Sequence, residues 1–129
     1  MSISKPNGET ARRFFGAWRY LGSVIDGKPR PDRTNPSGII IYDPSGHMAV
    51  QIMPGRGERR PAEPNATTYI CYFGQWSIDE QARTVTHHRE NDLRVDGEID
   101  AVRQYEFVGD RLILSPVGKD QQITWERIK

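Results

Sequence analysis

The chain has 129 residues, of which 36% are hydrophobic and 27% are charged. This length supports one hydrophobic core and is too short for two. Eighteen basic and seventeen acidic residues leave a net charge of +1, which argues against a nucleic-acid partner because such proteins concentrate positive charge. The densest basic run, residues 56–60, lies in a stretch rich in Pro and Gly and is interrupted by Glu58, so we interpret it as a solvated loop.

The cysteine content and the hydropathy pattern restrict the chemistry and the compartment. The single cysteine, Cys71, excludes an internal disulfide and a multi-cysteine metal site. No segment is apolar enough to be a signal peptide or to span a bilayer. We therefore expect a cytoplasmic protein with no membrane partner, and no motif indicates a metal or a cofactor.

Taken in chain order, the sequence predicts a helical turn followed by strands. Residues 1–9 are polar and are predicted to be a flexible N-terminus, and residues 10–129 form the domain. Thr10 is suited to cap a short helical turn that reaches Phe14. Beyond it no segment keeps a helical period. Short β-rich runs separated by turn residues predict strands at 17–25, 38–42, 47–53, 68–78, 84–90, 101–108, 111–115 and 121–128.

About eight strands joined in sequence order, with no crossover helix, predict an all-β fold. The expected architecture is an antiparallel up-and-down β-barrel, because a sheet that closes on itself leaves no exposed edge.

Two tight turns predict which side chains face the interior. A two-residue turn at Gly109-Asp110 pairs Val108 with Arg111, so alternation places one face inward: Arg103, Tyr105, Phe107, Leu112 and Leu114. A turn at Asp43–Gly46 similarly places a second set inward, although the opposite face is nearly as apolar: Ile40, Tyr42, Met48, Val50 and Ile52. On the other strands the predicted inward sets are Trp18, Tyr20 and Val24; Trp76, Ile78, Val85 and His87; and Ile123, Trp125 and Arg127.

Several segments carry a resemblance to a known family. Gly16-Ala17-Trp18, after the short helical turn, looks like the Gly-x-Trp signature of lipocalins. The segments GIIIYDPSGHM (38–48), YFGQWSID (72–79), TVTHH (84–88) and RQYEF with GDRL (103–112) resemble, in this order, the small bacterial and fungal lipocalin-like domain family. The resemblance covers Phe14 to Ser115 and implies a compact single-domain barrel. It supplies no uniform catalytic motif, and the loop at 54–65 is shorter than the corresponding segment of the family.

Aromatic side chains predicted to line the interior are the candidate ligand-binding residues. They are Trp18, Tyr20, Tyr42, Tyr72, Trp76, Phe107 and Trp125. Arg103 would be costly in an apolar interior without a partner or an anionic ligand. Alternatively, Arg103 stacks on a tryptophan ring at the end of the barrel. Arg127 is a second candidate for this stacking position, on the ring of Trp18.

The two adjacent histidines bear on catalysis and on metal binding. Neighbouring residues of a strand face opposite sides, so His87 and His88 cannot bind one ion together. His87 is predicted to face inward. If the protein is an enzyme, we expect His87, Arg103 and Tyr105 to be its catalytic residues, with the histidine moving a proton and the arginine or tyrosine stabilising an oxyanion.

Three functional hypotheses remain open at this point. The first is a barrel that binds a small, largely apolar ligand with one anionic or carbonyl group. The second is a cofactor-free isomerase, cyclase or lyase that uses His87 as an acid or base. The third is a structural or oligomer-forming module with a filled interior. Under any of the three, the strand of Cys71 or the outer face with Ile113 could mediate a homodimer.

Overall fold

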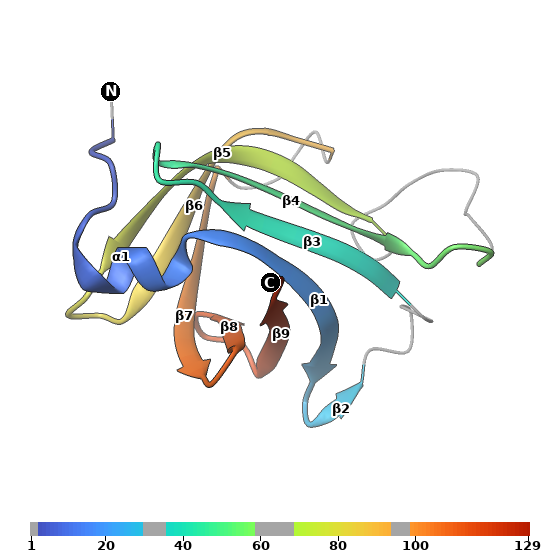
Figure 1. Ribbon diagram of the computed structural model, residues 1–129. Coiled ribbons are helices and arrows are strands. Elements are labelled where there is room, and N and C mark those ends of the chain that lie inside the picture. The colour runs from blue at the N-terminus through green and yellow to red at the C-terminus, as the bar shows by residue number, and fades with distance from the viewer. Residues whose placement is uncertain (1–2, 30–35, 59–68, 94–98) are drawn as a thin grey trace.

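The computed structural model describes residues 3–29, 36–58, 69–93 and 99–129 and shows a β-barrel with one short helix (Figure 1). The elements are α1 (Gly8–Phe14), β1 (Gly16–Ile25), β2 (Lys28–Pro29), β3 (Pro36–Tyr42), β4 (His47–Pro54), β5 (Ile70–Asp79), β6 (Thr84–Asp92), β7 (Asp100–Val108), β8 (Arg111–Pro116) and β9 (Gln121–Arg127). Every predicted strand is present, with ends that differ by at most two residues. The predicted strand start at residue 68 and the basic residues 59 and 60 lie outside the described residues. The two-residue strand β2 was not predicted, and it pairs with the end of β1.

The strands pair in sequence order, and β1 closes the barrel. The sheet runs β2-β1-β3-β4-β5-β6-β7-β8-β9, and β1 also pairs with β9. One strand can serve both neighbours because Gly16–Arg19 pairs with β3 and Trp18–Ile25 pairs with β9. In Figure 1, β1 curves between a wall formed by β3, β4 and β5 and a wall formed by β7, β8 and β9, and α1 lies at one end. The predicted antiparallel up-and-down barrel is thus confirmed.

Both tight turns have the predicted geometry. Gly109 has a φ of +60°, and Val108 pairs with Arg111. In the β3–β4 turn Gly46 has a φ of +93°, and the backbone N–H of Ser45 donates to the Asp43 carboxylate at 3.0 Å. The faces that these turns were expected to bury are buried in β3, β4 and β8: Ile40, Tyr42, Met48, Val50, Ile52, Leu112 and Leu114.

Two bulges change the alternation that the sequence predicts. In β1 the register shifts between Tyr20 and Gly22, so Ser23 is buried in place of Val24, and the prediction for Val24 was wrong. The Ser23 hydroxyl is hydrogen-bonded to that of Tyr20 at 2.5 Å. In β5 and β6 the register shifts between Phe73 and Gly74, which leaves one extra residue in β6.

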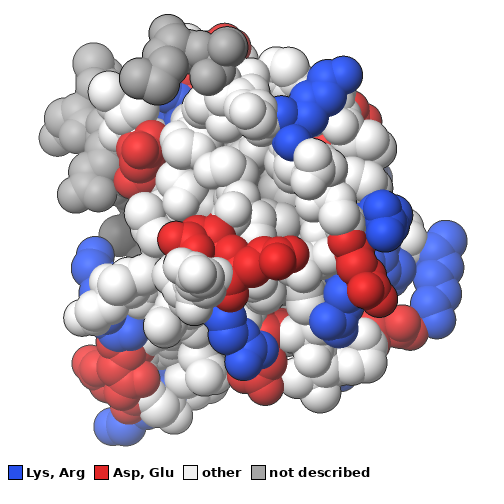
Figure 2. Space-filling view, turned by 90° about the vertical axis from the view of Figure 1, so that its left-hand side faces the viewer, with Lys and Arg blue, Asp and Glu red and all other residues white. Residues whose placement is uncertain are grey.

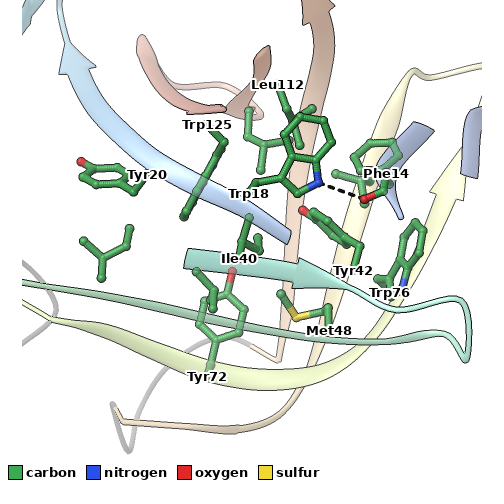
Figure 3. Close-up of a cluster of buried hydrophobic side chains, with 14 of the residues drawn as sticks. Phe14, Trp18, Tyr20, Ile40, Tyr42, Met48, Tyr72, Trp76, Leu112 and Trp125 are labelled. Carbon is green, nitrogen blue, oxygen red and sulfur yellow. Dashed lines mark hydrogen bonds between the residues drawn. The ribbon is translucent and has the colours of Figure 1, made fainter. Parts of the chain in front are cut away.

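Aromatic packing and one arginine close the end of the barrel near α1. Phe14 of α1 packs against the rings of Tyr42, Trp76, Tyr105 and Phe107 at centroid distances of 4.9 to 5.6 Å. Its carbonyl accepts a hydrogen bond from the Trp18 indole at 2.9 Å (Figure 3). Arg127 lies over the Trp18 ring at 4.1 Å and donates to the carbonyls of Phe15 and Arg13. Of the two arginines considered for this stacking position, Arg127 occupies it.

Candidate functional site

A histidine and two tyrosines from three different strands are hydrogen-bonded to one another inside the barrel. His87 on β6 is 2% exposed, and its Nε2 lies 2.6 Å from the hydroxyl oxygen of Tyr42 on β3. Its Nδ1 lies 2.7 Å from the hydroxyl oxygen of Tyr72 on β5. Figure 3 shows both tyrosine side chains pointing into the interior. The inward position expected for His87 is the one that the structure has.

The surroundings of His87 keep its ring neutral. Burial, and next the charges of Arg103 and Arg89, lower the pKa of His87 to about 3. Both ring nitrogens are already hydrogen-bonded to tyrosine hydroxyls. A proton passing between His87 and a bound molecule would therefore have to pass through Tyr42 or Tyr72.

Two charged residues that the sequence analysis did not single out join this group. Arg89 and Asp92 on β6 have side chains that are only 8% and 12% exposed, with Nε and Oδ2 3.6 Å apart. The Arg89 guanidinium lies over the ring of Tyr72, 4.5 Å from its centroid. The bulge explains why two residues at odd spacing both face inward, because Arg89 pairs with Gly74 before the shift and Asp92 pairs with Tyr72 after it.

Arg103 on β7 brings a second positive charge to the same group. It pairs across the sheet with Val85 and Pro116, which are both buried, so its side chain lies on the inward face. Its guanidinium is close enough to lower the pKa values of Tyr42 and Tyr72, although burial has the larger, opposite effect on both hydroxyls. Two guanidinium groups, those of Arg89 and Arg103, thus lower the pKa values of His87 and of Tyr72.

The predicted aromatic residues form much of the interior, and one of them has an unsatisfied donor. Trp18, Tyr20, Tyr42, Tyr72, Trp76 and Trp125 are all buried. The indole N–H of Trp76 donates to the Asp43 carbonyl at 3.1 Å. The indole N–H of Trp125 has no acceptor among the described residues, although the side chain is 2% exposed. A buried donor without an acceptor costs about 1–3 kcal/mol, so this N–H would gain from a ligand that offers one.

Tyr105 and Phe107 lie in different surroundings from His87. Both are only partly buried and, with Arg83, Glu106 and outward residues of β8 and β9, line an open groove of about 690 Å³. Burial, and next the charge of Glu80, raise the pKa of Tyr105. None of the charged groups that act on Tyr105 acts on His87, and the two residues are not brought into one site.

His88 and Cys71 face away from the interior. His88 is hydrogen-bonded to the Ser77 hydroxyl at 2.7 Å and to the Asp100 carboxylate at 3.1 Å. Cys71 is exposed. In the part of the chain that the structure describes, no three His, Cys, Asp or Glu side chains gather in a way that could hold a metal ion.

The surface near α1 carries both signs of charge. Figure 2 looks onto this end of the molecule and shows Lys and Arg interspersed with Asp and Glu. No broad area of one sign is visible among the described residues of this face. None of the described helices is long and apolar enough to cross a membrane.

Comparison with known proteins agrees with the barrel fold. A family model described as a lipocalin-like domain matches residues 16–128. Among solved structures, the chain is similar to the crystal structure of a DUF4847 family protein from Bacteroides vulgatus, with a TM-score of 0.55 and 17% identity over 94% of this chain and 99% of the other. No curated protein matches. At this identity the structural match shows a shared fold.

Proposed function

The chain belongs to the lipocalin-like domain family, and we propose that it binds a small, largely apolar ligand with one anionic or carbonyl group inside its barrel. The observation that carries this proposal is the buried, hydrogen-bonded Tyr42–His87–Tyr72 group, with Arg89, Asp92 and Arg103 close to it, within an aromatic interior. Apolar walls with a few convergent polar groups are typical of small-molecule sites, and the polar groups set the orientation of the ligand.

Two features favour a ligand with an oxygen acceptor. Arg89 and Arg103 bring positive charge close to Tyr72 and His87, and an anionic or strongly polarised ligand oxygen would be stabilised beside a guanidinium group. The Trp125 indole N–H is a further donor that a ligand oxygen could satisfy. Most of the rest of the interior is a cluster of aromatic and aliphatic side chains, which suits an apolar molecular body.

Two fluorescent probes of the same aromatic skeleton test this proposal. 8-Anilino-1-naphthalenesulfonate carries a sulfonate, and N-phenyl-1-naphthylamine is its neutral counterpart. We expect saturable binding of both, and we expect Arg103→Ala to weaken binding of the sulfonate about tenfold, which corresponds to roughly 1.4 kcal/mol, with little effect on the neutral probe.

Arg111→Ala is the matched control, because Arg111 faces outward on β8, is 58% exposed and should leave both affinities unchanged. Near-UV circular dichroism confirms that each variant keeps its packed core. If neither probe binds saturably, the proposal is wrong. An equal loss for both probes in Arg103→Ala would instead assign the arginine a structural role.

A second candidate is cofactor-free acid–base catalysis, which the hydrogen bonds of His87 with Tyr42 and Tyr72 favour. The ring opening of 5-nitrobenzisoxazole, which needs only a base in apolar surroundings, is a suitable probe reaction. Turnover that is lost in His87→Gln and kept in His88→Gln would support this candidate. A rate equal to that in buffer would contradict this candidate, and ligand binding would remain the proposed function.

A further inference from the structure

The hydrogen bonds around His87 leave one proton unused. A neutral imidazole has one N–H donor and one nitrogen acceptor, and each tyrosine hydroxyl has one proton. The Tyr42–His87–Tyr72 group therefore has three protons for its two hydrogen bonds. One tyrosine donates to the ring, the other accepts from it, and the accepting tyrosine keeps its own proton for another acceptor.

The position of Arg89 indicates which tyrosine donates to the ring. The Arg89 guanidinium lies over the ring of Tyr72, 4.5 Å from its centroid. A positive charge beside a phenol favours loss of its proton and makes its hydroxyl a stronger hydrogen-bond donor. The charges of both Arg89 and Arg103 oppose the rise that burial causes in the pKa of Tyr72.

Tyr42 has no such contact with Arg89. Burial raises the pKa of its hydroxyl well above the usual value, and the neighbouring Tyr72 raises it further. The more acidic Tyr72 is thus the better donor to Nδ1, which leaves the N–H on Nε2 to donate to the oxygen of Tyr42.

Within the part of the chain that the structure describes, the Tyr42 hydroxyl proton has no second partner. The side chain is 0% exposed, and its ring packs against the rings of Phe14, Trp76 and His87. Among the described residues, its only hydrogen bond is the one with His87. Figure 3 shows the Tyr42 hydroxyl directed toward the middle of the barrel, on the same side as the hydroxyl of Tyr72.

We propose that His87 is held as the Nε2–H tautomer by Tyr72, and that the Tyr42 hydroxyl is the donor that selects a carbonyl or carboxylate oxygen of the ligand. This inference rests on the proposed binding function and makes Tyr42 its specificity-determining residue. His87 and Tyr72 act as positioning residues, because they set the direction of the donor. A ligand of equal shape without the oxygen would leave the Tyr42 proton unsatisfied and would bind less tightly.

The tautomer can be measured without any ligand. In protein labelled with ¹⁵N in its histidines, long-range proton–nitrogen correlations at pH 7 identify which ring nitrogen of His87 carries the proton. The expected result is a protonated Nε2 and an unprotonated Nδ1. A protonated Nδ1 would overturn the inference, since Tyr72 would then keep the unused proton.

The ligand preference is measured with acetophenone and ethylbenzene, which have similar shapes and differ by the carbonyl oxygen. Each competes with N-phenyl-1-naphthylamine, and the ratio of the two dissociation constants gives the preference for the carbonyl compound. We expect this preference for acetophenone to be about tenfold larger in the wild type than in Tyr42→Phe. Tyr69→Phe makes the same change just before β5, outside the hydrogen-bonded group, and should keep the wild-type preference.

The outcomes separate this inference from the proposal on which it rests. Saturable binding with a preference that Tyr42→Phe does not change would overturn the role of Tyr42 and leave the binding function standing. No saturable binding of N-phenyl-1-naphthylamine would overturn the binding function itself. If Tyr42→Phe does not fold, the tautomer of the wild-type protein still decides the direction of the hydrogen bonds.

Discussion

The burial of neutral His87 predicts a specific loss of stability in mild acid. In the unfolded chain the histidine has its usual pKa of 6.5, whereas in the folded barrel the pKa is about 3. As the pH falls below 6.5, the unfolded state takes up a proton that the folded state does not, so the folded state loses stability. Between pH 7.5 and pH 5 this one residue should lower the free energy of unfolding by about 2 kcal/mol.

Urea unfolding at a series of pH values measures this contribution when the wild type is compared with His87→Gln. Glutamine can still donate and accept a hydrogen bond but does not titrate, so the difference between the two curves isolates His87 from the carboxyl groups. His47→Gln removes a histidine from the exposed end of the β3–β4 turn and serves as the control. An NMR titration of His87 in the wild type provides a second measurement that needs no variant.

Parallel curves for the wild type and His87→Gln between pH 7.5 and pH 5 would refute the reasoning. They would mean that His87 takes up its proton equally well in the folded and unfolded states. The ring would then have access to water or to a negative charge, which the described contacts of His87 do not provide.

Three further predictions concern the framework of the site. Gly74→Ala should destabilise the barrel by more than about 3 kcal/mol in thermal unfolding, because its Cβ would lie 2.0 Å from the His88 carbonyl oxygen, whereas Gly22→Ala meets nothing within 4 Å and should be nearly neutral. Arg127→Ala should cost about 2 kcal/mol in urea unfolding through the lost stacking on Trp18 and the lost bonds to two carbonyls, against less than about 0.5 kcal/mol for Arg111→Ala. The double variant Arg89→Met/Asp92→Leu should be within about 1 kcal/mol of the wild type or more stable, yet bind 8-anilino-1-naphthalenesulfonate less tightly.

The fold could be predicted from the sequence because its turns have strong local signals. Glycines at Gly46 and Gly109 take up positive φ angles, and each turn sets the register of two strands. Once the register is set, alternation determines which residues are buried, as Leu112 and Leu114 show. No comparable signal marks β2, where two residues pair at the end of a longer strand.

The candidate site was predicted only in part, because it depends on bulges and on contacts between distant strands. Alternation placed His87 inward, but no spacing in the sequence indicates that Tyr42 and Tyr72 reach its two nitrogens from β3 and β5. The same alternation places Tyr105 on the inward face, but it does not predict how far Tyr105 lies from His87. Beyond the last β6–β7 pair, Thr84 with Gln104, β7 pairs with β8, and Tyr105 packs against Phe14 of α1.

The bulge opposite Gly74 shows how such a site could be found in a sequence. A glycine inside a strand indicates a bulge or a close backbone contact, and after a bulge the inward positions change parity. With this rule, Arg89 and Asp92 both become inward candidates.

Replacing a buried ion pair by apolar residues is often neutral or stabilising. A barrel that served only as a structural module would therefore gain nothing from keeping two arginines and an aspartate around a neutral histidine. The shape of the barrel needs none of these charges, whereas a ligand with an oxygen acceptor would use them. Full affinity of the Arg89→Met/Asp92→Leu variant for the sulfonate probe would show that these charges do not serve ligand binding.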